Sequence, residues 1–392
     1  MRNLVKTALL LALAASLLLF ASCTPSGQGG DEGPILIGHA VALTGGSALW
    51  GQSEKNALEM EIKEINAAGG VLGRELKLIA YDTKADQAEA VNVANRLVAD
   101  GVVAVIGPAQ SGVGIAASAI FEDAGIPMIA TTATNEKLTV PEGSDEPLQY
   151  IFRTCFIDPY QGDVAATFAL KDLGLTKAGI LKDVGSDYST YLASYFESTF
   201  KAGGGTIVAN ESFRTEELEY KAQLSKIKEA GAELLFIPTM QKEAGLAMKQ
   251  ARELGMDCVF LGGDGWASVE LVELGGEATE GAYFVNIASL ADPTIADWVE
   301  SYRAAYGRDP VMPNPVLAVD GLRVVAAAIE AVGGTEDRAA IAEWIANCKD
   351  VPVLTGTLTF DPATHNPVGK AAVIERVEDG QFVFYQNISA KS

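Results

Sequence analysis

The segment VVAVIGPAQSGVGIAASAIFEDAGIPMIATTATN, residues 102–135, contains two apolar runs separated by a helical pattern. The runs cover residues 102–106 and 126–129, and apolar residues recur between them at helical spacing. This order is typical of a strand, a helix and a second, parallel strand. Because ligands of such units gather outside the carboxyl ends of the strands, we expect a binding site there.

Both strand ends in this segment carry hydroxyl groups and flexible backbone rather than catalytic side chains. Ser111 stands where the helix would begin, and Thr134 follows the second strand. A small anionic group could be held there by these hydroxyls and by free backbone N–H groups at the helix N-terminus. The alternative is structural: Ser111 caps the helix and the threonines close a turn.

Residues 1–22 have the pattern of a signal peptide. Arg2 and Lys6 precede an apolar run at 8–20 that is too short to span a membrane comfortably. The following FASC at 20–23 resembles a bacterial lipobox, which implies that Cys23 is acylated. Residues 23–33, rich in Gly, Ser, Pro and acids, then predict a flexible tether. We therefore expect an exported protein held at a bacterial membrane surface by lipid alone.

Length, charge and cysteine content narrow the class of protein. A chain of 392 residues exceeds what one core usually serves, so two lobes are expected. The net charge of −22 disfavours nucleic acid and anionic lipid as partners. Cys155, Cys258 and Cys348 follow neither a disulfide framework nor a zinc pattern. We expect buried free thiols, with one disulfide as the alternative, and neither a metal nor a cofactor.

Strand and helix patterns alternate along most of the chain, which predicts an α/β fold with mainly parallel sheets. Further strands are expected at 35–43, 76–81, 177–182, 206–213, 234–238, 259–262, 282–287, 357–360, 371–377 and 382–387. Helices are expected around 58–65 and at 85–99, 160–173, 189–201, 220–230, 244–254, 295–306 and 315–332. The last two strands are joined through Asp379 and Gly380, a hairpin signal.

Two long phrases near the N-terminus point to a known family. They are GHAVALTGGSALWGQ at 38–52 and INAAGGVLGRELKLIAYDTKAD at 65–86. With QARELG, FLGGDGW and ATEGAY later in the same order, the chain resembles the periplasmic ligand-binding proteins of branched-chain amino acid ABC transporters.

This resemblance implies fold type I, in which two lobes joined by three crossings close on a ligand like a Venus flytrap. Lobe 1 would hold residues 34–153 and 282–354, and lobe 2 residues 154–281 and 355–392.

The resemblance also implies where the two charges of an amino acid would be bound. Ser111, Thr132 and Thr134 match the positions that hold the ligand carboxylate, and Asp264 matches the acid that pairs with the α-ammonium. Leucine-type receptors often have Glu at the latter position, so the ammonium must come closer or be bridged by water. Alternatively, Asp264 between glycines is only a turn residue.

Three further positions would surround the ligand side chain. The resemblance places Trp50 against it from the first loop and Tyr188 in the second lobe. Met240 stands where close relatives have Tyr; it donates no hydrogen bond and is adaptable in shape. The alternatives are that Trp50 is a core aromatic of lobe 1 and that Tyr188 lies at the surface.

The predicted function is a lipid-anchored, monomeric receptor that captures a branched-chain or other apolar amino acid for the permease of an ABC importer. The same scaffold also takes amides, urea and aromatic acids, and it serves sensors that present ligand to another receptor.

Enzymatic functions fit the sequence less well. The only histidines are His39 and His365, and neither accompanies a nucleophile elbow or a zinc-protease helix. A catalytic pair of Asp82 and Asp264 would come from different lobes. GVGIAA at 112–117 mimics a dinucleotide fingerprint, but no acid ends the next strand.

Overall fold

The computed structural model describes residues 33–388 and forms one compact unit that begins at Pro34. The signal peptide, Cys23 and nearly all of the tether lie outside the described residues. No helix within 33–388 combines the length and the apolar character needed to cross a bilayer.

The first sheet has five parallel strands in the order β2-β1-β3-β4-β5. These strands are β1 (Ile35–Val41), β2 (Leu76–Asp82), β3 (Ala104–Ile106), β4 (Met128–Ala130) and β5 (Ile151–Arg153). Its helices are α2 (Ala48–Ala67), α3 (Gln87–Ala99), α4 (Ser111–Ala124), α11 (Asn314–Val332) and α12 (Arg338–Asn347). The parallel pairing of β3 with β4 around α4 confirms the unit predicted at 102–135.

Helix α4 positions the carboxyl end of β3. It ends at Gly125, whose φ of 63° places it in the left-handed region that favours glycine. It begins at Ser111, while Gln110 occupies the capping position without a side-chain cap. The idea that Ser111 caps this helix is therefore wrong, and its hydroxyl is available for another contact.

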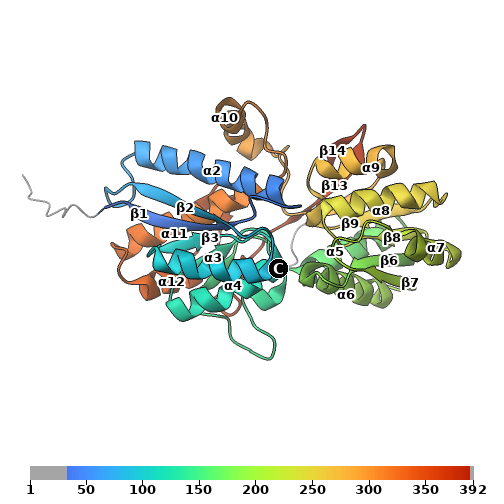
Figure 1. Cartoon of the computed structure of the whole chain (residues 1–392), viewed down its shortest axis with the longest axis horizontal. Coiled ribbons are helices and arrows are strands. Elements are labelled where there is room, and N and C mark those ends of the chain that lie inside the picture. Colours follow the sequence, from blue (N-terminus) through green and yellow to red (C-terminus); the bar gives the residue numbers. More distant parts are fainter. Residues whose placement is uncertain (1–32, 389–392) are drawn as a thin grey trace, which may run out of the picture. The chain divides into compact units, whose positions relative to one another are not determined.

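Helix α11 joins the first sheet from far along the sequence. In Figure 1 the orange α11 lies with the blue and cyan elements, and it packs against α2. Leu322 and Val325 from α11 share a buried cluster with Ile37 and Ile106 of the sheet. Burial of each such side chain is worth about 1.5–3 kcal/mol, so this lobe needs the late segment for its core.

The second sheet has seven strands in the order β14-β13-β10-β9-β8-β6-β7. They are β6 (Lys177–Asp183), β7 (Thr206–Phe213), β8 (Leu234–Phe236), β9 (Val259–Gly262), β10 (Tyr283–Asn286), β13 (Ala372–Glu378) and β14 (Gln381–Ile388). The last two are antiparallel and form the predicted hairpin, with Asp379 and Gly380 both at positive φ. Its helices are α5 (Asp158–Lys171), α6 (Asp187–Ala202), α7 (Lys221–Glu229), α8 (Gln241–Glu253) and α9 (Glu270–Gly275).

One predicted strand joins a different sheet from the one expected. The resemblance implies that residues 282–287 belong to lobe 1, but β10 pairs with β9 and β13 of the second sheet. The chain returns to the first lobe only after β10, through α10 (Ala296–Tyr306), which contacts α2. Hydrophobic periodicity can identify a strand, but which strands it pairs with depends on contacts between residues far apart in sequence.

The chain passes between the sheets three times: after β5, after β10 and after β12 (Gly356–Leu358), which pairs with β11 (Val351–Val353). The fold is thus α/β with two mainly parallel sheets flanked by helices. Cys155, Cys258 and Cys348 are buried free thiols, as predicted.

Candidate functional site

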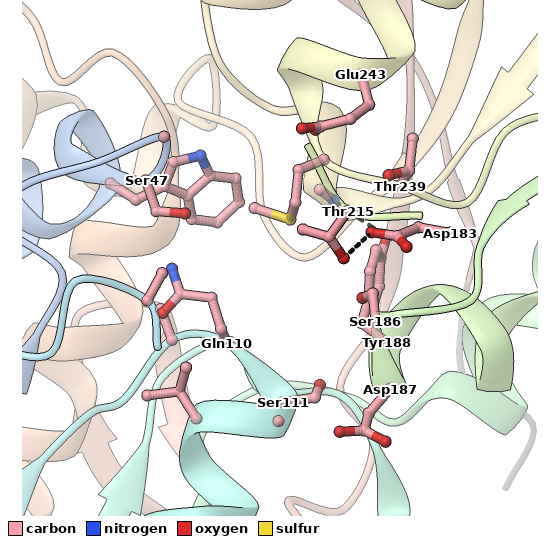
Figure 2. Close-up of a pocket in the computed structure, with 18 of the residues that line it drawn as sticks. Ser47, Gln110, Ser111, Asp183, Ser186, Asp187, Tyr188, Thr215, Thr239 and Glu243 are labelled. Carbon is pink, nitrogen blue, oxygen red and sulfur yellow. Dashed lines mark hydrogen bonds between the residues drawn. The ribbon is translucent and has the colours of Figure 1, made fainter. Parts of the chain in front are cut away.

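A cavity of about 300 Å³ opens at the carboxyl ends of strands from both sheets. Figure 2 shows Ser47, Gln110 and Ser111 on one wall, facing Asp183, Tyr188 and Glu243 on the other. Six of the seven predicted ligand-binding residues line it: Trp50, Ser111, Thr132, Tyr188, Met240 and Asp264. The two sheets therefore bring together residues that are up to 214 positions apart. They meet at the carboxyl ends of parallel strands, where ligands of such folds gather.

The first wall offers a hydroxyl at the start of α4. Ser111 is 3% exposed, and its Oγ accepts a hydrogen bond from the backbone N–H of Asn135 at 3.2 Å. That contact leaves the hydroxyl proton of Ser111 free to be donated. Thr132 differs, because its hydroxyl donates to the carbonyl of Ala109 at 3.0 Å. Of these two hydroxyls, Ser111 is better prepared to bind an anion.

Thr134 does not line the cavity. It is fully buried behind the wall, beside Asp158. Its Oγ1 and both carboxyl oxygens of Asp158 have no hydrogen-bond partner within residues 33–388. Burial raises the pKa of Asp158 well above its ordinary value.

Arg153, at the end of β5, fixes the segment that carries these threonines. Its guanidinium is fully buried and donates to the carbonyl oxygens of Ala133 at 2.6 Å and Glu136 at 3.4 Å. It also donates to the hydroxyl of Thr139 at 3.3 Å. A delocalised guanidinium suits this role because several donors lie in one plane. These hydrogen bonds fix the conformation of the loop after β4.

The second wall carries a buried acid. Asp264 follows β9, is 3% exposed, and accepts a hydrogen bond from Nε2 of Gln161 at 2.7 Å. Burial raises the pKa of Asp264 to about 6, while Gln161 and Tyr188 act in the opposite direction. At neutral pH the carboxylate is ionised with no cation bonded to it within the described residues, so it favours a positively charged group.

Tyr188 packs tightly against the loop that presents Asp264. It is 8% exposed, which rules out a surface role, and its hydroxyl accepts from the backbone N–H of Gly265 at 3.2 Å. A Cβ at Gly263 would lie 2.5 Å from that hydroxyl, so only glycine permits this approach. Met240 lies nearby, with its sulfur 3.3 Å from a Cβ built at Gly265.

The cavity is also lined by polar residues that were not predicted from the sequence: Gln87, Gln110, Asp183, Asp187, Thr215, Thr239, Gln241 and Glu243. The carboxylate of Asp183 accepts hydrogen bonds from the hydroxyl of Thr215 (Figure 2) and from the backbone N–H of Gly185, so its charge is partly satisfied within its own wall. Gln241, from the second wall, forms hydrogen bonds with residues of the first wall. The expected helix began at 244, three residues after the true start of α8, so Gln241 was not predicted as a site residue.

The residues considered for enzymatic chemistry do not assemble. His39 is buried, with Nδ1 3.0 Å from the carbonyl oxygen of Ile106, and burial lowers its pKa to about 4. Asp82 lies outside the cavity lining and accepts from the N–H of Leu43 and the hydroxyl of Thr44. Within residues 33–388, no cluster of His, Cys, Asp and Glu could hold a metal ion.

Comparison with known proteins identifies relatives along most of the chain. Residues 34–381 match the family model for periplasmic binding proteins. A Leu/Ile/Val-binding protein homologue from Brucella melitensis is 31% identical over 83% of this chain and 87% of its own length.

Two crystal structures are similar as well, each 31% identical with a TM-score of 0.82. One is a leucine-binding protein from Thermotoga maritima, covering 90% of this chain and 98% of that one. The other, from Streptococcus pneumoniae, is the substrate-binding protein of a branched-chain amino acid transporter in complex with isoleucine, covering 92% and 100%. Sequence, fold and a cavity shared by two lobes agree: the chain belongs to the periplasmic binding protein family, whose members bind solutes rather than transform them.

Proposed function

We propose that this protein captures a branched-chain or other apolar amino acid outside the cytoplasm and delivers it to the permease of an ABC importer. The observation that carries this proposal is the buried carboxylate of Asp264 on one wall of a cavity whose other wall presents Ser111. A zwitterion needs its two charges met separately, and these groups have the required polarity. The relatives from Thermotoga maritima and Streptococcus pneumoniae support leucine and isoleucine as first candidates.

The carboxylate of the ligand would lie on the first wall. Ser111 has a proton to donate, and the N-terminus of α4 adds the positive end of a helix dipole. Thr132 would contribute through its backbone, because its hydroxyl proton is already used. Thr134 would need to turn toward the cavity to take part, since it lies behind the wall in this structure.

The ligand side chain would lie among Trp50, Tyr188 and Met240. All three line the cavity and are apolar over most of their surface, which suits an aliphatic group. Met240 is flexible and unbranched, so it can adapt to leucine, isoleucine or valine.

Charge around the cavity supports a ligand that carries an ammonium group. Its lining includes the acids Asp183, Asp187, Glu216, Glu243 and Asp264 but only the bases Lys84 and Lys242. An acidic lining of this kind attracts cationic groups and disfavours simple anions. Aromatic acids are therefore weaker candidates than amino acids, and amides and urea carry no ammonium group to pair with Asp264.

The protein's location and partners complete the proposal. Family membership implies a place outside the cytoplasm. We further propose attachment by lipid on Cys23, action as a monomer, and docking to a permease rather than a sensor. The lobes would comprise residues 34–153 with 287–354 and residues 154–286 with 355–392, and the pairing of β10 with the second sheet supports this division.

A ligand screen tests this function. Leucine, isoleucine and valine should raise the melting temperature of the mature protein, because a ligand at 100 times its Kd stabilises the folded state by about 2.7 kcal/mol. Amides, urea and benzoate, tested at equal concentration, serve as comparison compounds. Stabilisation by those compounds and by no amino acid would contradict the proposed ligand class.

The affinity for leucine should depend on pH through Asp264. Burial raises the pKa of this carboxyl from 3.8 to about 6, so it becomes protonated as the pH falls through 6. Protonation removes the partner of the ammonium, and the measured Kd should rise roughly tenfold for each pH unit well below 6. Calorimetry between pH 4.5 and 8 measures this, and an Asp264→Asn variant should lack the dependence. Equal slopes in both proteins would assign the titration to another group.

A further inference from the structure

The side chain of Gln241 links the two lobes at one end of the cavity. It is the first residue of α8 and is 1% exposed. Its Oε1 accepts from the indole Nε1 of Trp50 at 3.3 Å, and its Nε2 donates to the carbonyl oxygen of Gly46 at 3.3 Å. We infer that Gln241 is a positioning residue that sets the orientation of Trp50 and thereby tunes affinity for large aliphatic ligand side chains.

The amide of Gln241 is itself held in one orientation. Its Nε2 also donates to Oε2 of Glu270 at 2.9 Å, and Glu270 is the first residue of α9. Because an amide nitrogen cannot accept from an indole N–H, the bond to Glu270 forces Oε1 toward Trp50. Two residues of the second lobe therefore act together on one indole of the first.

Trp50 is fixed at its backbone by its own lobe. The Nδ2 of Asn314 donates to the carbonyl oxygen of Trp50 at 3.2 Å, while the indole N–H is bonded to Gln241. The backbone thus belongs to the first lobe, whereas the direction of the ring depends on the second.

This arrangement gives Gln241 an effect on ligand choice, which rests on the proposed function. Trp50 lines the cavity and would contact the ligand side chain beyond its Cβ. A long side chain such as that of leucine would use the aromatic wall, whereas alanine would hardly reach it. Loss of the bond from Gln241 should therefore affect leucine more than alanine.

The test combines Gln241→Met, which keeps the length of the side chain and removes its polar atoms, with Trp50→Phe in a double-mutant cycle. Calorimetry should show leucine binding about three- to tenfold weaker in Gln241→Met, as for one lost hydrogen bond. Alanine binding should change less than about twofold, because it makes little use of this bond. In the Trp50→Phe background, Gln241→Met should have no further effect on leucine binding.

A second arm needs no ligand. The chain has four tryptophans, so subtracting the emission of Trp50→Phe from that of the unmodified protein isolates Trp50. Gln241→Met should shift this difference spectrum and speed the decay of its anisotropy. Should Gln241→Met not fold, Glu270→Ala releases the same amide and should change both readouts in the same direction.

Gln250→Met is the matched control. Gln250 is a second buried glutamine on α8, bonded to the N–H of Tyr220 and the carbonyl oxygen of Leu218, and its variant should alter neither Trp50 emission nor the leucine-to-alanine ratio. Unchanged Trp50 emission in Gln241→Met, or an equal loss of leucine affinity in both backgrounds, overturns the inference. If the unmodified protein binds no amino acid, the proposed function fails, while the emission arm still decides whether Gln241 orients Trp50.

Discussion

Replacement of Asp264 by Asn should weaken leucine binding by about 30- to 1,000-fold, which corresponds to 2–4 kcal/mol for a lost buried charge pair. Asparagine keeps the shape of the side chain and can still bond to Gln161, so the change removes mainly the charge. Isothermal calorimetry at pH 7.5, above the raised pKa of Asp264 of about 6, measures the effect on the ionised form.

The control for this experiment removes a charge elsewhere on the same cavity. Glu216 also lines it but is exposed, and water screens its interaction with a ligand. Glu216→Gln should change leucine affinity by less than about twofold, since exposed ion pairs are worth little. If both variants lost affinity equally, the general field of the cavity and not Asp264 would bind the ammonium.

Replacement of Arg153 by Met should produce the largest loss of stability linked to the site. The substitution removes every hydrogen bond that the guanidinium makes and leaves the buried carbonyl oxygen of Ala133 and the partly buried one of Glu136 without these donors. We expect the free energy of unfolding to fall by about 2–4 kcal/mol, measured by urea denaturation. Leucine affinity should fall as well, because the loop that carries Thr132 loses its support.

Arg303→Met serves as the comparison. Arg303 pairs with Asp309 on the surface, with a side chain that is 56% exposed, and its replacement should leave the urea midpoint and leucine affinity unchanged within error. A similar midpoint for the two variants would show that the buried contacts of Arg153 contribute no more than a surface pair.

Most elements of the fold follow from hydrophobic periodicity. Long strands such as β6 and β7 and the helix α11 lie within a few residues of the predicted ranges. β5 was not predicted, because three residues ending in a charged arginine do not resemble a strand. The strand forms because contacts with distant residues bury Arg153, and the local sequence gives no sign of this burial.

Some residues of the candidate site could be predicted from the sequence and others could not. Ser111 was anticipated because strand ends and helix starts are recognisable in sequence, whereas Asp264 was anticipated only through the family resemblance. Gln241 was not, because its partner Trp50 lies 191 residues away and belongs to the other lobe. The side-chain direction of Thr134 was also beyond the sequence, because residues 131–135 follow the end of β4 and form no strand, so the regular alternation of strand side chains does not extend to them.

The placement of β13 and β14 has a consequence for biosynthesis. β10 pairs with β13 on one side, so its outer edge stays unsatisfied until residues 372–388 have left the ribosome. Pairings between such distant residues form slowly, because a long loop must close first. A nascent chain that lacks its last hairpin should therefore remain open to chaperones and proteases, and truncation near residue 370 should yield a product that is degraded rather than a shortened receptor.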